Sequence, residues 1–190
     1  MMTAKELDRL RERAWEYLDT KRVPHVRGCE KEAVSLAEHW GENAEDAAVA
    51  GMLHDCTKRL NRDQHLQIIR DSGLVFPEEL LKEKKLLHAV SGSIVAEKDF
   101  GVSGKISSAI RWHTTGRPDM TMLEKIIYLA DYIEETRDFE GVDKLRRLSY
   151  KNIDEAMALG LKMSVENIKE RGEEPYIDSL LAYRFYNRKE

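Results

Sequence analysis

Six side chains of the kinds that bind divalent metals occur between positions 25 and 131. They are four of the six histidines and two aspartates, and two of them form a His-Asp doublet. Imidazole and carboxylate groups suit transition metals. A structural zinc site is closed by fewer ligands than this set offers, so the set predicts an open site for one or two ions that activate a water. The candidate ligands are His25, His54, Asp55, His88, His113 and Asp131.

The expected helices explain how these residues can meet. His25 lies at the start of one predicted helix, and His54 and Asp55 lie at the end of the next. Adjacent residues in mid-helix point about 100° apart, whereas the relaxed backbone at a helix end lets the doublet turn toward one point. Asp131 lies on the apolar side of its helix, where a carboxylate is costly unless it is paired or metal-bound. The positions therefore favour one shared site.

Helical signals recur along the whole chain. Thr3-x-x-Glu6 and Thr121-x-x-Glu124 are capping boxes, and Gly41 is a C-terminal stop. We find no sustained strand alternation and no domain boundary, so we expect an all-α fold, a single-domain helical bundle over residues 1–190. The expected helices cover 3–18, 24–40, 44–55, 61–73, 86–99, 103–113, 122–133, 153–171 and 175–187, with a short helix beginning at Pro77.

Composition limits the class of function. Hydrophobic residues make up 42% and charged residues 35%, a profile typical of a helical protein. The net charge of −4 argues against nucleic acid as a partner, but a bound cation would supply local positive charge for a phosphorylated small molecule. The charged N-terminus lacks the apolar segment of a signal peptide, and no run reaches the roughly 20 apolar residues of a membrane span. We therefore expect a cytoplasmic protein with no membrane partner.

The remaining histidines and the cysteines have plainer interpretations. Cys29 and Cys56 are too few for a disulfide framework, and we expect reduced thiols that fill small apolar spaces. Both lie near proposed ligands, so ligation by cysteine stays open. His39 and His65 lie outside the pattern, and we interpret them as ordinary core or surface histidines.

The order His25, His54-Asp55, Asp131 resembles the signature of the HD-domain metal-dependent phosphohydrolases, an all-helical superfamily. His88 and His113 match the additional pair of members that hold two metals. Longer stretches resemble the bacterial YqeK family of symmetrical dinucleoside tetraphosphatases, which split diadenosine tetraphosphate into two ADP. These stretches are RVPHVRGCEKEAVSLA, AGMLHDCTK, LLHAVSGSIVAEKDFGV, AIRWHTTGRPDMTMLEKIIYLADYIEETRDFEGVD and PYIDSLLAYRFYN.

The resemblance implies an HD-superfamily helical bundle and one or two divalent transition-metal ions, with iron as the first choice and manganese or cobalt as alternatives. It implies that metal-bound hydroxide attacks an inner phosphorus of the tetraphosphate. In this arrangement Asp55 bridges two ions, of which His25, His54 and Asp131 complete one and His88 and His113 the other.

Neutralising the charge of a phosphate requires cations near the site. Lys58 lies one turn after the doublet and is expected to bind a metal-bound phosphate and to take part in catalysis with Asp55; a solvated surface lysine is the alternative. Thr114, Thr115 and Gly116 offer hydroxyls and an amide as a phosphate cradle. Arg137 ends the helix of the second aspartate, where it suits a bidentate phosphate contact or the helix dipole.

Other cations and other functions remain as alternatives. Arg111 lies two residues before His113, on the opposite helix face, and is excluded, while Arg27 and Arg117 are candidates without a ranking. The chain could instead be an HD-type nucleotidase or nucleoside triphosphate hydrolase acting on mononucleotides, or a non-catalytic metal-containing nucleotide-binding module. The expected partner is a small-molecule nucleotide, and the sequence leaves a homodimer open.

Overall fold

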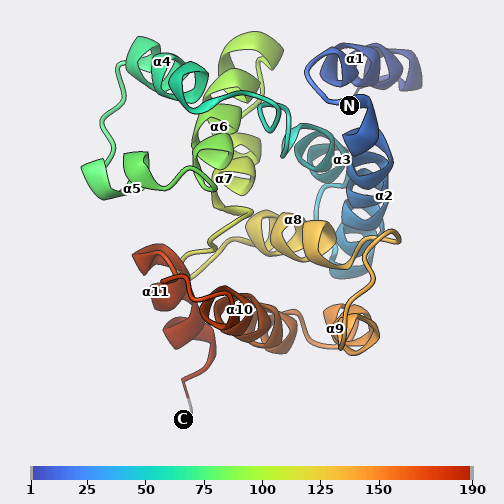
Figure 1. Cartoon of the computed structure of the whole chain (residues 1–190). Helices are drawn as coiled ribbons and strands as arrows, with labels where there is room; N and C mark the ends of the chain where they lie inside the picture. Colours follow the sequence, from blue (N-terminus) through green and yellow to red (C-terminus); the bar gives the residue numbers. More distant parts are fainter. Residues whose placement is uncertain (1, 189–190) are drawn as a thin grey trace.

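The helices begin and end where the sequence places their caps. The computed structural model describes residues 2–188, and in it Thr3, Asn61 and Thr121 form capping boxes. Gly41 ends a helix in the left-handed conformation at φ 71°. The helices, labelled as in Figure 1, are α1 Ala4–Glu16, η1 Thr20–Arg22, α2 Val23–Trp40, α3 Ala44–Leu53, α4 Arg62–Ser72, α5 Glu78–Lys82, α6 Leu87–Phe100, α7 Gly104–Trp112, α8 Met122–Ile133, α9 Val142–Ser149, α10 Ile153–Glu170 and α11 Ile177–Tyr186.

Helix α8 forms the middle of the bundle. In Figure 1 it lies between α2, α3 and α7 on one side and α9 and α10 on the other. Leu123, Ile126, Ile127 and Leu129 on this helix are fully buried, as expected of a helix enclosed on several faces. Burying each such side chain contributes about 1.5–3 kcal/mol, so the position of α8 is well determined.

A smaller apolar cluster attaches α4 and α5 to α6. Ile69 and Leu80 pack against Leu87, Val90 and Ile94. The segment from α4 to α5 therefore lies on the outer side of α6, at the upper left of Figure 1, and it forms one side of a cavity described below.

The all-α fold is confirmed, and the differences from the expected elements have local causes. Helix α8 has the expected bounds, whereas α3 ends at Leu53 and leaves the His-Asp doublet in the turn that follows. Helix α9 and the η1 turn were not expected from the sequence. Helix α9 follows Gly141 at φ 89° and has no side-chain cap, so it lacks the usual N-terminal signal. Among residues 2–188, no helix is long and apolar enough to span a membrane.

Candidate metal centre

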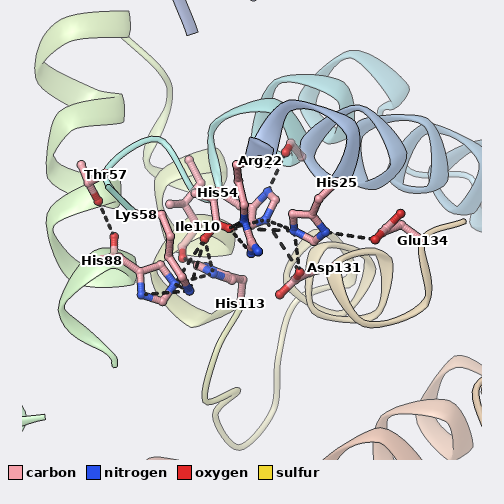
Figure 2. Close-up of polar contacts among 12 residues, drawn as sticks. Arg22, His25, His54, Thr57, Lys58, His88, Ile110, His113, Asp131 and Glu134 are labelled. Carbon is pink, nitrogen blue, oxygen red and sulfur yellow. Dashed lines mark hydrogen bonds and ion pairs between the residues drawn. The ribbon is translucent and has the colours of Figure 1, made fainter. Parts of the chain in front are cut away.

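The six candidate ligands converge on one buried centre. Their ligand atoms form three groups of three residues, and within each group all the ligand atoms lie within 4.8 Å of one another. The residues come from α2, the turn after α3, α6, the end of α7 and α8, and Figure 2 shows the labelled histidines in a row from His88 to His25 with Asp131 beside them. The groups are His25, His54 and Asp55; His54, His113 and Asp131; and Asp55, His88 and His113.

Three of the four imidazoles are oriented by an acceptor on the side away from the centre. Because carbonyl and carboxylate oxygens accept hydrogen bonds, each Nδ1 carries the proton and each Nε2 presents a lone pair to the centre. Such outer partners are typical of histidines that bind metals. The acceptors are the Gly51 carbonyl for His54 (2.7 Å), the Ile110 carbonyl for His113 (2.7 Å) and the Glu134 carboxylate for His25 (3.0 Å).

The arrangement of the lone pairs suits cations. The Nε2 atoms of His25 and His54 are 3.2 Å apart, and those of His88 and His113 are 3.1 Å apart. For His25 and His54, whose Nε2 atoms both carry lone pairs, this distance is repulsive unless a cation lies beside them. Beside the other pair lies the Lys58 ammonium, 3.0 Å from His88 Nε2. Asp55 lies between the two pairs, and its Oδ1 is buried without a hydrogen-bond partner among residues 2–188. These donors therefore fit one or two divalent ions.

The two oxygens of Asp55 face different histidine pairs. Oδ2 is 3.5 Å from His54 Nε2 and 3.8 Å from His25 Nε2. Oδ1 is 3.3 Å from His88 Nε2 and 3.7 Å from His113 Nε2. A carboxylate in this position is suited to bridge two ions, each associated with one pair.

The charges of the centre keep Asp55 and His88 in the deprotonated form that metals require. For His54, burial alone would lower the pKa, but the neighbouring Cys29 and Asp55 raise it well above its usual value. Burial alone would raise the pKa of Asp55, but the imidazoles of His54 and His113 and the Lys58 ammonium hold that pKa well below its usual value. Burial and the Lys58 charge hold the pKa of His88 well below its usual value. Asp55 is therefore ionised and His88 neutral at neutral pH.

The cysteines and the other two histidines lie outside the three groups. Cys56 donates from Sγ to the Gly92 carbonyl at 3.8 Å, and burial raises the pKa of its thiol to about 12. Burial also raises the pKa of Cys29. The His65 ring forms a hydrogen bond with the Ser91 hydroxyl through Nδ1 (2.7 Å), and the ring of His39 packs against Trp40 and Tyr150. The plainer interpretations of these residues agree with their surroundings.

A cavity of about 1080 Å³ opens beside the centre, and three of the five expected substrate contacts line it. Lys58 Nζ is 3.0 Å from His88 Nε2. Arg137 donates from Nη2 to Asp131 Oδ1 at 2.6 Å. Thr114 Oγ1 is buried and has no hydrogen-bond partner among residues 2–188. Lys58 and Arg137 can therefore present two charges to an anion in the cavity, and Thr114 lines the same wall with its hydroxyl buried.

Thr115 and Gly116 lie away from the cavity. Thr115 is 1% exposed and its hydroxyl donates to the carbonyl of Gly116 at 2.9 Å. Gly116 has φ 64°, and a Cβ atom placed on it would lie 3.2 Å from Leu161 Cδ2. The chain thus turns into the core directly after Thr114, so the expected three-residue cradle is reduced to one residue.

The other arginines have separate partners. In agreement with its exclusion, Arg111 lies 4.0 Å from Asp178 of α11 and outside the residues that line the cavity. Arg27 and Arg117 also lie outside them: Arg27 packs over the ring of Trp15 at 4.4 Å, and Arg117 pairs with Glu124 at 2.8 Å.

The sequence interpretation missed three residues around the ligands. Arg22 donates from Nε to Asp55 Oδ2 at 2.6 Å. Glu134 is 0% exposed, and besides His25 it contacts Thr136 Oγ1 at 2.5 Å. A Cβ atom placed on Gly28 would overlap Oε2 of Glu134, so the glycine makes room for this carboxylate. The only sequence signal that could have indicated Glu134 is its position, because this acidic residue directly follows an apolar helix.

Comparison with known proteins places these observations in a family. The family model for the HD domain matches residues 22–136. The chain is 35% identical to a symmetrical bis(5'-nucleosyl)-tetraphosphatase of Bacillus subtilis, over 88% of this chain and 90% of that protein. A protein of the same name in Staphylococcus aureus is 34% identical, over 76% of this chain and 74% of that protein.

A solved structure and a longer relative extend the comparison. The crystal structure of a predicted HD superfamily hydrolase involved in NAD metabolism from Clostridium acetobutylicum has a TM-score of 0.90 and 33% identity, over 98% of each chain. A probable nicotinate-nucleotide adenylyltransferase/Ap4A hydrolase of Mycoplasma genitalium is 32% identical over 80% of this chain, which covers 44% of that protein.

Proposed function

The chain belongs to the HD domain family, and from this premise we propose that it is a metal-dependent hydrolase that cleaves dinucleoside tetraphosphates symmetrically. Diadenosine tetraphosphate and water would give two ADP. The observation that carries the proposal is that half of the ligand cluster lies in the wall of the 1080 Å³ cavity, beside Lys58 and Arg137. These three ligands are His88, His113 and Asp131. The cavity volume is slightly above the roughly 300–1,000 Å³ typical of ligand pockets, which leaves room for an extended substrate.

We propose that two ions would be held here, one by His25, His54 and Asp131 and the other by His88 and His113, with Asp55 serving both. The distances of the two Asp55 oxygens from the two histidine pairs support this division. When bound, divalent ions bring the pKa of a water toward neutrality and polarise a phosphoryl oxygen. Four imidazoles favour iron, manganese or cobalt over magnesium, and iron is our first choice.

Lys58 and Arg137 are proposed to neutralise the phosphates from two sides of the cluster. Lys58 lies on the side of His88, and Arg137 lies on the side of Asp131. Cleavage at an inner phosphorus leaves a diphosphate on each side of the broken bond, and one cation for each diphosphate would stabilise the charge that develops. Thr114 is proposed to donate to a phosphate oxygen through its hydroxyl, which has no partner among residues 2–188.

We also propose that residues 1–190 act as one domain on a small-molecule nucleotide. Both cysteines are buried free thiols, which supports a cytoplasmic location where thiols stay reduced.

The position of cleavage tests this function. Metal-loaded protein should convert diadenosine tetraphosphate to ADP alone, and in heavy-oxygen water one of the two ADP molecules should carry one labelled oxygen. Asp55→Ala should retain the helical fold and lose activity. ATP and AMP as products would refute the symmetric assignment. Turnover of AMP, dAMP or dGTP in place of the dinucleotide would favour the mononucleotide alternative, and no turnover of either class would favour a binding module.

A further inference from the structure

The cavity continues from the metal centre to an aromatic end. Tyr132 directly follows Asp131 in α8, and Phe139 lies in the loop between α8 and α9. Their ring centroids are 5.3 Å apart with an interplanar angle of 53°, both rings are half-buried, and both line the cavity. Two adjoining aromatic side chains with a side open to a cavity form a surface on which a flat ring can stack.

Helix α10 forms the facing wall. It packs against α8 (Figure 1), and Leu159, Met163 and Asn167 line the cavity from positions four residues apart, which share one helix face. Met163 also touches the loop that carries Phe139, because a Cβ atom placed on Gly141 would lie 3.0 Å from Met163 Cε. The aromatic pair and the α10 face therefore border the same part of the cavity.

The charges that line the cavity differ along its length. Near the metal centre the lining cations are Lys58 and Arg137, which suit phosphates. At the aromatic end the lining side chains that carry charge are all exposed, and they are Glu140, Glu166, Glu170, Lys144 and Arg171. The carboxylates outnumber the cations there, so this end suits a neutral ring better than a further phosphate.

We propose that Tyr132 and Phe139 stack on one nucleobase of the substrate and that Asn167 recognises the edge of that base. This inference rests on the proposed function, since it assigns the nucleoside end of the same cavity. The amide of an asparagine can donate and accept at once, which matches the amino group and ring nitrogen of adenine. An adenine nucleotide is therefore the ligand class that this end prefers over a guanine nucleotide.

Product binding to the metal-loaded protein tests the subsite separately from catalysis. Titration calorimetry with ADP and with inorganic pyrophosphate compares a ligand that has a base with one that lacks it. Tyr132→Leu and Phe139→Leu keep apolar bulk and remove the ring. Each should raise the Kd of ADP about tenfold, ~1.4 kcal/mol, and leave that of pyrophosphate unchanged. Phe100→Leu, a half-buried aromatic residue outside the cavity, is the matched control.

The base preference gives a second measurement. Asn167→Ala should reduce the preference for ADP over GDP while leaving the affinity for pyrophosphate unchanged. Metal content and melting temperature show whether each variant folds, and Phe139→Leu decides the question if Tyr132→Leu does not fold. Unchanged ADP affinity in the folded variants would overturn the subsite even if the wild-type protein cleaves the dinucleotide. Weaker ADP binding in a protein that does not cleave it would support the subsite and refute the proposed function.

Discussion

Gly28 allows the metal centre to be perturbed without changing any ligand. It lies within α2, one turn after His25, and is buried. A Cβ atom at this position would overlap Oε2 of Glu134 and would lie 3.2 Å from Cδ and 3.3 Å from Cβ of that residue. Glu134 is also held by the backbone N–H of Thr136, which donates to Oε2 at 2.7 Å. Gly28→Ala should therefore displace Glu134 from Nδ1 of His25.

Two opposing effects set the change in stability. Replacing glycine by alanine within a helix stabilises the fold by about 0.5–1 kcal/mol. Forcing an additional methyl group into a packed region costs about 1–3 kcal/mol, so the free energy of unfolding should fall by roughly 0–2.5 kcal/mol. The loss of the partner that orients a ligand typically lowers metal affinity about 10–100-fold. The loss in metal binding, about 1.4–2.7 kcal/mol, should thus be at least comparable with the loss in stability.

Metal-stripped protein titrated with Mn²⁺ under reducing conditions would measure this affinity, and calorimetric melting would measure stability. Gly104→Ala is the matched control, because no atom lies within 4 Å of a Cβ atom placed there. Its affinity should equal that of the wild type. Glu134→Gln keeps an acceptor for His25 and loses the charge, so its affinity should lie between those of the wild type and Gly28→Ala.

A Gly28→Ala protein that binds metal with wild-type affinity and melts at a higher temperature would refute the reasoning. The result would mean that Glu134 has room to move aside, or that the orientation of His25 does not depend on it.

Three further predictions follow from the centre and its surroundings. Lys58→Ala should lower kcat/KM about tenfold, ~1.4 kcal/mol, with unchanged metal content and melting temperature. Unchanged steady-state kinetics would mean that Lys58 is a solvated surface lysine without a role in the reaction. Chelation should abolish hydrolysis and lower the melting temperature, because a ligand that binds only the folded state stabilises it, and added Mn²⁺ should restore both. Cys29 and Cys56 should react with a thiol reagent at neutral pH only after denaturation, because burial raises the pKa of both thiols; rapid labelling of the folded protein would contradict this.

The sequence alone determined most of the helices and the types of ligand. Capping boxes such as Thr121 to Glu124 and stops such as Gly41 act through neighbouring backbone groups, so local patterns predict them. The ligand types were also evident, because an imidazole or a carboxylate on the apolar side of a helix has few other uses. The pattern of six residues and the family resemblance therefore led to the same centre before any contact was known.

Only the tertiary structure decided how the site is completed. The hydrogen bond between His25 and Glu134 joins residues 109 positions apart, and no local periodicity encodes such a pair. The turn at Gly116 decides that Thr114, and not Thr115, lines the cavity. Another wall of the cavity comes from α10, which carries no sequence motif. Each of these features depends on how separate helices pack, and packing is set by side-chain shapes that meet only after the chain has folded.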